Sequence, residues 1–279
     1  MNAVIYLNGA TLMTTNTQRV LEIARDTGYA GIEARVERLL QSSAEVRATA
    51  ELARPNEVLT VNGVALSLRS DGRMNREQLD ADLPPRLRIC KEIRSRYLLA
   101  IVPRAPGLQT SRAIPGTREA LELARERAGA MGIRIGFEFL GFADCPINTP
   151  ALAGEVVDGV DGIELVLDSC HWHASGARPL RDYPVERLAL VHLNDAPAMP
   201  PLEIEDRDRV FPGEGVINLR DLAKDLTADG YAGPWSLETF NASYWGEDPA
   251  EVAGRGLAAV LRIVGGSPEG LPPNLDLDP

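Results

Sequence analysis

Residues 116–138, GTREALELARERAGAMGIRIGFE, contain in order a helical pattern, a glycine and a short apolar run. Residues 116–131 space their leucines and alanines as an amphipathic helix does, with mixed charges between them. Gly132 follows at the position where a glycine commonly ends a helix in the left-handed conformation. Residues 133–137 are apolar and as long as a strand, and Glu138 comes directly after them. The stretch is therefore predicted to form one helix–strand unit.

The same unit recurs in both directions from this stretch. Eight apolar runs of strand length lie at residues 3–7, 31–34, 58–61, 97–102, 133–137, 162–167, 188–193 and 235–237. Helical patterns separate several of them, at residues 17–27, 116–131, 219–229 and 250–264. Such alternation predicts a parallel sheet, and eight strands close a (β/α)8 barrel, which uses roughly 250 residues as one domain. We predict an α/β protein with a single TIM barrel over residues 1–264, followed by an irregular tail over residues 265–279 that is rich in Gly, Pro and Asp.

The composition limits the classes of function. Of the 279 residues 44% are hydrophobic, which supports a sizeable core. The net charge of −11 argues against a nucleic acid or an anionic membrane as partner, although one local basic pocket would suffice for a phosphorylated substrate. Three cysteines, Cys90, Cys145 and Cys170, make no disulfide framework and are expected to be buried thiols of a cytoplasmic protein. The sequence shows neither a signal-peptide pattern nor an apolar run near the ~18 residues of a membrane span.

Four consecutive apolar runs, the fifth to the eighth, lead at their carboxyl ends to an ionisable residue. These residues are Glu138, Asp168, His192 and Glu238. The carboxyl ends of barrel strands form one face of the molecule, and active sites are built there. One such residue alone would most simply be a rim charge with a salt-bridge partner, whereas four on consecutive strands predict a functional site.

The residue types of this set favour a metal ion. Three carboxylates and one imidazole suit Mn²⁺, Mg²⁺ or Co²⁺, and they can also hold Zn²⁺. Three carboxylates that meet without a cation would repel one another strongly. Because no thiol belongs to the set, a closed structural zinc site is not expected. The sequence therefore predicts one divalent metal ion at the barrel face.

The loop after the seventh run, residues 195–215, is long and rich in prolines and charges. In it, Arg209 precedes the turn of residues 212–215 (PGEG), which can hold the guanidinium rigidly over the site to bind a substrate oxygen. The alternative is a solvated surface arginine. His171, three residues after Asp168, is placed to touch the substrate or to orient a ligand. The polar segment 67–82 is a candidate cover for the site.

These motifs resemble the sugar-phosphate isomerase/epimerase superfamily with its xylose isomerase-like barrel, and most closely its inosose isomerase branch. The matching segments are residues 136–141 (GFEFLG), 165–173 (LVLDSCHWH), 191–195 (VHLND) and 208–215 (DRVFPGEG). Weaker matches are residues 8–11 (NGAT) and 28–33 (GYAGIE), whereas residues 39–55 and 69–86 depart from the family pattern.

The resemblance implies a role for individual residues. It implies that Glu138, Asp168, His192 and Glu238 bind one divalent metal, with Mn²⁺ the first expectation. Because Glu138 and Glu238 belong to separate strands, they could flank the substrate, and we expect them to be the catalytic carboxylates. The resemblance also implies that five residues meet a small polyhydroxylated carbonyl substrate: His171, Arg209, Asp144, Asn8 and Glu33. Asp144 falls where related ketose epimerases carry a glutamate.

The ligand set predicts chemistry next to a carbonyl. A bound metal polarises the carbonyl, a carboxylate takes the α-proton, and an enediolate results. Return of the proton at the neighbouring carbon is isomerisation, and return on the opposite face is epimerisation. Expulsion of a β-substituent instead is elimination, as in a dehydratase or in a lyase that opens a C-glycoside. The sequence leaves these outcomes open.

Two further classes of protein remain to be weighed. The DNA-repair enzyme endonuclease IV shares the barrel superfamily by resemblance, but its type needs a histidine-rich three-zinc cluster, and this chain has three histidines and a charge of −11. A subunit that needs a partner chain, or a homo-oligomer, is compatible with the ligand set.

Overall fold

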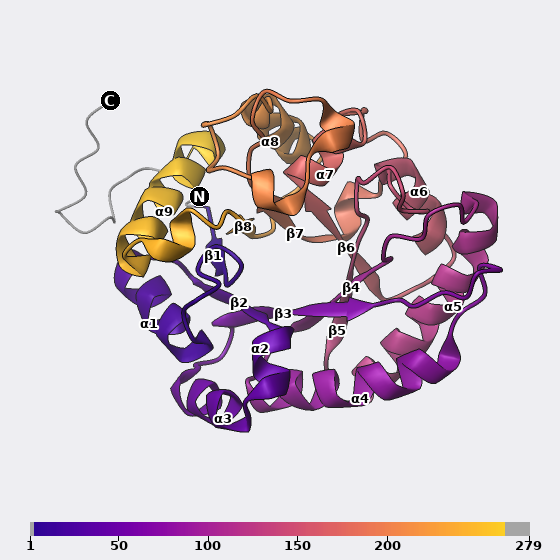
Figure 1. Ribbon diagram of the computed structural model, residues 1–279, viewed down its shortest axis with the longest axis horizontal. Coiled ribbons are helices and arrows are strands. Elements are labelled where there is room, and N and C mark those ends of the chain that lie inside the picture. The colour runs from indigo at the N-terminus through magenta and orange to yellow at the C-terminus, as the bar shows by residue number, and fades with distance from the viewer. Residues whose placement is uncertain (1–2, 266–279) are drawn as a thin grey trace.

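The protein is a closed barrel of eight parallel strands in chain order, with helices around the outside (Figure 1). This computed structural model describes residues 3–265. Its strands are β1 (Ile5–Asn8), β2 (Gly31–Arg35), β3 (Val58–Ala65), β4 (Tyr97–Ile101), β5 (Arg134–Glu138), β6 (Ile163–Asp168), β7 (Leu188–Leu193) and β8 (Trp235–Leu237). Each of the eight predicted apolar runs corresponds to one strand, and the predicted single barrel is confirmed. The predicted tail falls largely on residues 266–279, which lie outside the described residues.

Nine α-helices surround the barrel among the described residues, eight between strands and one after β8. They are α1 (Thr17–Thr27), α2 (Val36–Gln41), α3 (Ser43–Leu52), α4 (Arg76–Glu92), α5 (Thr110–Gly129), α6 (Pro150–Val157), α7 (Ser169–Ala174), α8 (Leu219–Ala228) and α9 (Pro249–Val264). Several begin at a residue whose side-chain oxygen accepts a backbone N–H of the first turn, as Asn16 does for α1 and Asn218 for α8. Gly28 ends α1 in the left-handed conformation with a φ of 98°. Gly132, predicted to adopt this conformation, has a φ of 75° three residues after the end of α5.

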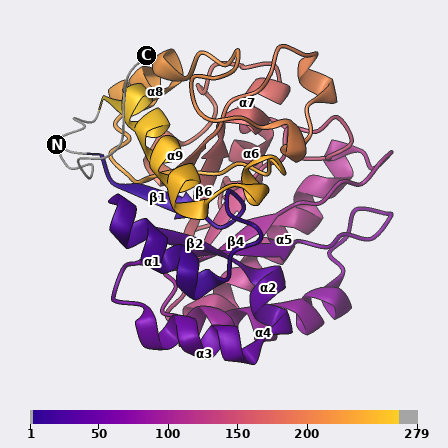
Figure 2. The same cartoon turned by 60° about the vertical axis from the view of Figure 1, so that its left-hand side comes forward.

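The helices differ from the sequence prediction mainly in the first half of the chain. The segment 67–82, predicted as a polar cover, ends in the first turns of α4. This helix contains Pro84 and Pro85, residues that normally interrupt a helix and so conceal it from pattern analysis. Figure 2 shows α1 to α4 packed together along the outside of β1 to β4.

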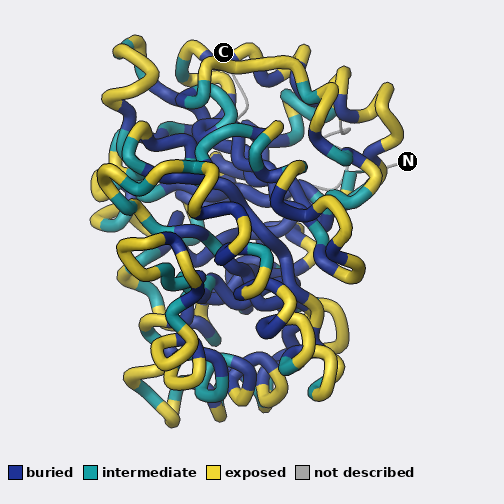
Figure 3. Tube along the Cα trace, turned by 90° about the vertical axis from the view of Figure 1, so that its right-hand side faces the viewer, coloured by how far each residue is buried: buried dark blue, intermediate teal, exposed yellow. Residues whose placement is uncertain are grey.

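The core has two parts because strand side chains alternate between two faces. The larger part packs the outward-facing strand residues against the helices. The smaller part fills the barrel interior with side chains such as Tyr6, Leu59, Tyr97 and Leu190. In Figure 3 the strands form a continuous buried centre, whereas exposed segments lie on the outer helices and loops. The strand ends are therefore fixed on a rigid support.

Within residues 3–265, no helix combines the length and the apolar character that crossing a lipid bilayer requires.

Candidate metal centre and active site

The four predicted ligands meet at the carboxyl ends of four neighbouring strands. Glu138 ends β5, Asp168 ends β6, His192 is the last but one residue of β7, and Glu238 directly follows β8. One ligand atom from each of them lies within 4.8 Å of the others, and all four residues are buried. The parallel register places Asp168 opposite His192, so adjacent strands deliver their ligands at one level.

The electrostatics of the cluster fit a bound cation. Burial raises the pKa of Glu138 to about 7, and the nearby carboxylates of Glu238 and Asp168 add to the effect. The pKa of Glu238 is raised as well, again mainly by burial. A divalent cation among these oxygens would offset both the desolvation and the repulsion. The donor set, three carboxylates and one imidazole, suits such an ion.

His192 is held in one orientation by a carboxylate on each side of its ring. Its Nδ1 lies 3.0 Å from Glu138 Oε1 and 3.4 Å from Glu238 Oε2, so this nitrogen faces the other ligands. Its Nε2 lies 3.1 Å from Glu33 Oε1 on the opposite side. Although burial opposes the charged ring, these three carboxylates raise the pKa of His192 well above its usual range. Metal ligation at Nδ1 would displace a proton and leave Glu33 to fix the tautomer.

Glu33 is itself surrounded by donors from three other strands. Asn8 Nδ2 donates to Glu33 Oε1 at 3.2 Å and to Glu238 Oε1 at 2.9 Å. The hydroxyls of Thr60 and Ser236 also donate to Glu33. Asn8 and Glu33, predicted as substrate contacts, are thus completely buried behind the ligands. They are not among the residues that line the site pocket.

Arg209 connects the loop after β7 to the ligand cluster. Its Nη1 donates to Glu238 Oε2 at 2.8 Å and to Asp168 Oδ2 at 3.1 Å, and its Nη2 donates to Asp206 Oδ1 at 2.7 Å. The residue is 2% exposed, which removes the alternative of a solvated surface arginine. Arg207, two residues earlier, is exposed.

His171 also contacts the Arg209 guanidinium, in addition to the three carboxylates. Its Nε2 lies 3.0 Å from Arg209 Nη2, and the ring of Phe142 packs edge-on against it. Burial, with the charge of Arg209, lowers the pKa of His171 to about 4 despite the opposing carboxylate of Asp168. His171 is therefore neutral near pH 7, and its Nε2 accepts the hydrogen bond from Arg209.

The loop that carries Arg209 is fixed by the carboxylate of Asp195. Asp195 Oδ1 accepts the backbone N–H groups of Ala196 and Ile217, each at 2.9 Å, and Oδ2 accepts that of Gly213 at 3.0 Å. Asp195 also forms an antiparallel bridge with Val210. Gly213 has a φ of 88°, a conformation that side chains other than glycine rarely adopt. The predicted rigid turn is therefore built from backbone hydrogen bonds to one carboxylate.

A pocket of about 290 Å³ opens over this centre, and four predicted site residues line it: Glu138, Glu238, His171 and Arg209. Asp144, also predicted to meet the substrate, does not line it. Its Oδ1 lies 3.6 Å from Arg104 Nε in the loop after β4, and its side chain is 35% exposed. Its predicted role stays a prediction.

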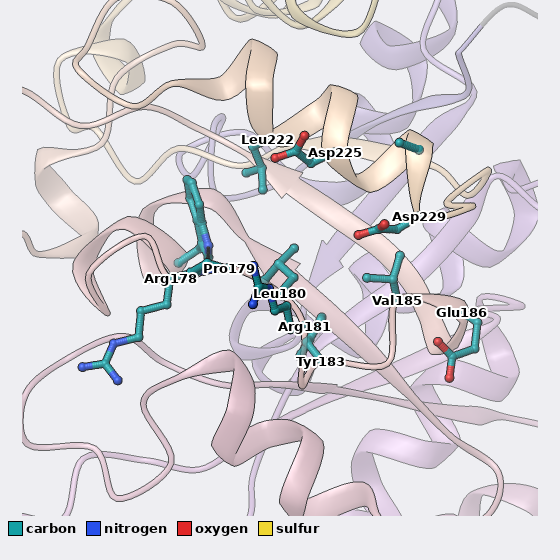
Figure 4. Close-up of a pocket in the computed structure, with 12 residues that line it drawn as sticks. Arg178, Pro179, Leu180, Arg181, Tyr183, Val185, Glu186, Leu222, Asp225 and Asp229 are labelled. Carbon is teal, nitrogen blue, oxygen red and sulfur yellow. Dashed lines mark hydrogen bonds between the residues drawn. The ribbon is translucent and has the colours of Figure 1, made fainter.

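A second hollow of about 530 Å³ lies elsewhere, between residues 178–186 and α8. In Figure 4 Leu222 and Asp225 of α8 lie above the Pro179–Leu180 segment, and the Arg178 side chain points away from them. None of the predicted ligands lines this hollow. The chemistry therefore belongs to the smaller pocket.

Sequence reasoning assigned no role to Asn194, although it lies in a matching motif. Asn194 Nδ2 donates to Asp168 Oδ2 at 2.6 Å and to the backbone oxygen of Glu238 at 3.0 Å. Asn194 directly follows β7, two positions after His192, so the alternation of the strand places both side chains on the same side. That alternation was the signal that could have identified it.

Comparison with known proteins gives two kinds of enzyme as relatives. The chain is 28% identical to the inosose isomerase of Bacillus velezensis over 250 residues, which cover 84% of this chain and 87% of that protein. It is 34% identical to the 3-dehydroshikimate dehydratase of Pseudomonas putida over 149 residues, which cover 51% of this chain and 23% of that protein. The similarity to inosose isomerases expected from the motifs is thus confirmed.

Among solved structures, the crystal structure of the IOLI protein with a bound zinc atom has a TM-score of 0.84. It is 25% identical in sequence, and the superposition covers 95% of this chain and 98% of that one. The family model of the xylose isomerase-like TIM barrel matches residues 21–263, nearly the whole barrel. This protein therefore belongs to the xylose isomerase-like TIM barrel family.

Proposed function

We propose that this protein is a divalent-metal-dependent isomerase or epimerase that transfers a proton next to a carbonyl of a small polyol, inosose or keto-sugar. The observation that carries the proposal is that Glu138 and Glu238 belong to the metal-ligand cluster and also line the pocket. A carboxylate that both belongs to the metal site and lines the cavity can exchange a proton with a substrate bound there. The similarity to inosose isomerases supports the same chemistry.

The residues Glu138, Asp168, His192 and Glu238 would hold the metal. When bound, a divalent cation supplies the Lewis acidity that polarises a carbonyl and acidifies the neighbouring C–H group. We propose Mn²⁺ first because the donor set is rich in oxygen, with Mg²⁺, Co²⁺ and Zn²⁺ as alternatives. The zinc of the similar IOLI structure makes Zn²⁺ the first alternative to test.

The protein's own residues move and hold the proton. One of Glu138 and Glu238 takes the α-proton, and the other, or a water molecule, returns it to the neighbouring carbon or to the opposite face. The raised pKa values of both carboxyl groups suit a proton acceptor and donor near neutral pH. The Arg209 guanidinium, which also lines the cavity, would bind a substrate oxygen that gains charge. Neutral His171 beside it would accept or donate a hydrogen bond to a hydroxyl.

A lyase is the second candidate function. It begins with the same proton abstraction, after which the electron pair expels a β-substituent instead of recapturing a proton. The similarity to 3-dehydroshikimate dehydratase over half of this chain favours this alternative. A C-glycoside-cleaving lyase that needs a partner subunit would use the same site.

Deuterium exchange tests the proposal. The purified, metal-loaded protein is incubated in D₂O with a panel of inososes, ketoses and keto-glycosides, and mass spectrometry follows the substrate and its products. We expect the wild-type protein to incorporate deuterium next to the carbonyl and the variants Glu138→Gln and Glu238→Gln to incorporate none. Product analysis separates isomerisation, epimerisation and elimination. Exchange at the wild-type rate in both variants would remove these carboxylates from the mechanism.

Assembly and compartment complete the proposal. A homo-oligomer or a complex with a partner subunit is compatible with the single-chain site, and size-exclusion chromatography with and without co-expressed neighbouring gene products would distinguish them. We place the protein in the cytoplasm, since Cys90, Cys145 and Cys170 are all free thiols.

A further inference from the structure

Two arginines, Arg35 and Arg86, line the pocket on the side opposite the metal-ligand strands. Arg35 ends β2 and pairs in register with Asn62 of β3. Arg86 belongs to α4 and donates from Nε to the backbone oxygen of Gly63, the next residue of β3. The ligands, in contrast, come from β5 to β8. The two guanidinium groups therefore belong to the β2–β3 side of the cavity.

Arg35 is only weakly paired by the protein. Within the part of the chain that the structure describes, its one ion pair is with Glu37 at 3.4 Å. The Glu37 side chain is 60% exposed, whereas that of Arg35 is 15% exposed. An ion pair with so exposed a partner contributes little to the free energy that holds Arg35 in place. Among the described residues the buried Arg35 Nε has no hydrogen-bond partner. The guanidinium lies 5.1 Å from the centre of the Phe240 ring, which also contacts Arg209 and lines the pocket.

Arg86 is anchored so that part of its guanidinium remains available. Nε is bound to Gly63, and Nη1 donates to the backbone oxygen of Asp82 at 2.9 Å and to its Oδ1 at 3.1 Å. Within residues 3–265 the structure gives Nη2 no hydrogen-bond partner. The hydrogen bonds of Nε and Nη1 fix the orientation of the planar guanidinium group, which reduces the conformational entropy lost when a ligand binds.

Each arginine has one carboxylate partner, Glu37 for Arg35 and Asp82 for Arg86. Among the described residues, a neutral polyol would still leave Arg35 Nε and Arg86 Nη2 without an anionic acceptor. The buried carboxylates Asp168 and Glu238 already have Arg209, and a metal ion would balance the rest of the cluster. A guanidinium recognises carboxylate and phosphate groups through paired hydrogen bonds. Between the arginines and the ligands, the pocket wall is apolar where Val64, Leu99 and Ile101 line it. This wall suits the carbon skeleton that joins the two ends of a substrate.

We propose that Arg35 and Arg86 form an anion subsite, so that the substrate is a keto-polyol or keto-cyclitol that carries a carboxylate or phosphate remote from its reacting carbons. This inference rests on the proposed function, because that function places the reacting carbons at the metal centre. Binding of an anion by the two arginines can be measured without any reaction. It separates substrates that the metal centre alone treats alike.

Binding to the metal-loaded protein, measured by calorimetry, tests the subsite without requiring turnover. Two pairs of ligands isolate the charge: fructose 6-phosphate with fructose, and 3-dehydroshikimate with its methyl ester. The anionic member of at least one pair is expected to bind at least about tenfold more tightly than its neutral partner, and the pair that responds identifies the phosphate or the carboxylate. Equal affinities within both pairs, or no binding of either anion, would overturn the inference.

The variant Arg35→Met/Arg86→Met keeps the apolar stems and removes both charges. We expect it to lower affinity for the preferred anion about 10- to 100-fold and to change that for the neutral partner by less than about twofold. Arg88→Met, an exposed position on the same helix, is the matched control and should change neither affinity. Arg35→Lys and Arg86→Lys should retain part of the preference, because they keep the charge but lose the fork.

The two proposals fail in different ways. If the double variant weakens both members of a pair equally, the arginines only shape the pocket and the subsite is overturned. If deuterium exchange occurs with neutral inososes and no ligand shows a charge preference, the proposed function stands and the subsite falls. If the charge preference depends on the arginines but no panel member exchanges deuterium, the subsite stands and the proposed function falls.

Discussion

Arg209 contacts two carboxylates that are themselves predicted metal ligands, and it also lines the pocket. It can therefore act on a substrate oxygen at the place where charge develops. We predict that Arg209→Ala lowers kcat/KM about 10- to 150-fold, since a charge-assisted hydrogen bond contributes roughly 1.5–3 kcal/mol. Lysine at this position should restore only part of the activity, because it lacks the planar fork.

The exposed Arg207 on the same loop provides the control for this variant. Arg207→Ala should change kcat/KM by less than about twofold and the free energy of unfolding by less than ~0.5 kcal/mol. Metal content, measured by elemental analysis, should stay stoichiometric in all three variants. Equal small effects at both positions would assign Arg209 a purely structural role.

We predict that the metal affinity depends on pH, because Glu138 and His192 hold protons in the metal-free centre. In the metal-free centre the pKa of Glu138 is raised to about 7, and that of His192 is raised well above 6.5. Both groups must lose a proton to act as ligands, so affinity should fall as the pH falls through 7. The expected slope is about tenfold per pH unit for each proton displaced. Competition with a chromogenic chelator between pH 6 and pH 8 measures it, and a constant affinity across this range would contradict the assignment.

At the scale of one element, the loop between β7 and α8 depends on Asp195. Three backbone N–H groups of the loop and its flanks, those of Ala196, Gly213 and Ile217, donate to this carboxylate. Asp195→Ala leaves them without an acceptor, and each unsatisfied buried donor costs roughly 1–3 kcal/mol. We predict that the loop loosens, that kcat/KM falls about as far as in Arg209→Ala, and that the metal is retained.

Glu203→Ala serves as the control because Glu203 is exposed on the same loop. It should leave both kcat/KM and the thermal midpoint unchanged. Hydrogen exchange measured by mass spectrometry should show faster exchange over residues 195–217 in Asp195→Ala only. If exchange there stays slow while activity falls, the loop is held by other contacts.

For the whole molecule, metal removal should weaken the fold without abolishing it. The ligands lie at the barrel rim and the apolar core does not include them. A metal present at about 100 times its dissociation constant adds ~2.7 kcal/mol, which corresponds to roughly 5–10 °C in thermal midpoint for a domain of this size. Chelation should lower the midpoint by this amount while the far-ultraviolet circular dichroism stays native-like, and added metal should reverse the shift. Asp168→Ala should not respond to the chelator.

The barrel and its ligands could be predicted because both depend on short-range patterns. Strand runs and helical periodicity are local, and residues at the ends of parallel strands must share one face, so Glu138 and Glu238 could be placed together from sequence alone. The cluster that the structure brings together is the one that the sequence predicts.

The remaining features depend on tertiary contacts that no local pattern encodes. Glu33 is an acidic residue in the middle of β2, and only the packed barrel shows that it lies behind His192. The position of Arg86 follows from α4, whose two prolines conceal the helix. Arg209 looks like a surface residue in its charged segment, and its burial follows from the folding of residues 195–215 back over the strand ends.

The hydrogen bond between Asn8 and Glu238 spans 230 residues and joins the first strand to the last ligand. A nascent chain that has not yet released residue 238 from the ribosome has three of the four ligands and an open sheet in which β1 still lacks β8. Closure of the sheet and completion of the ligand cluster consequently await the same strand, β8. The order of synthesis therefore lets the metal site form only in a chain whose barrel can already close.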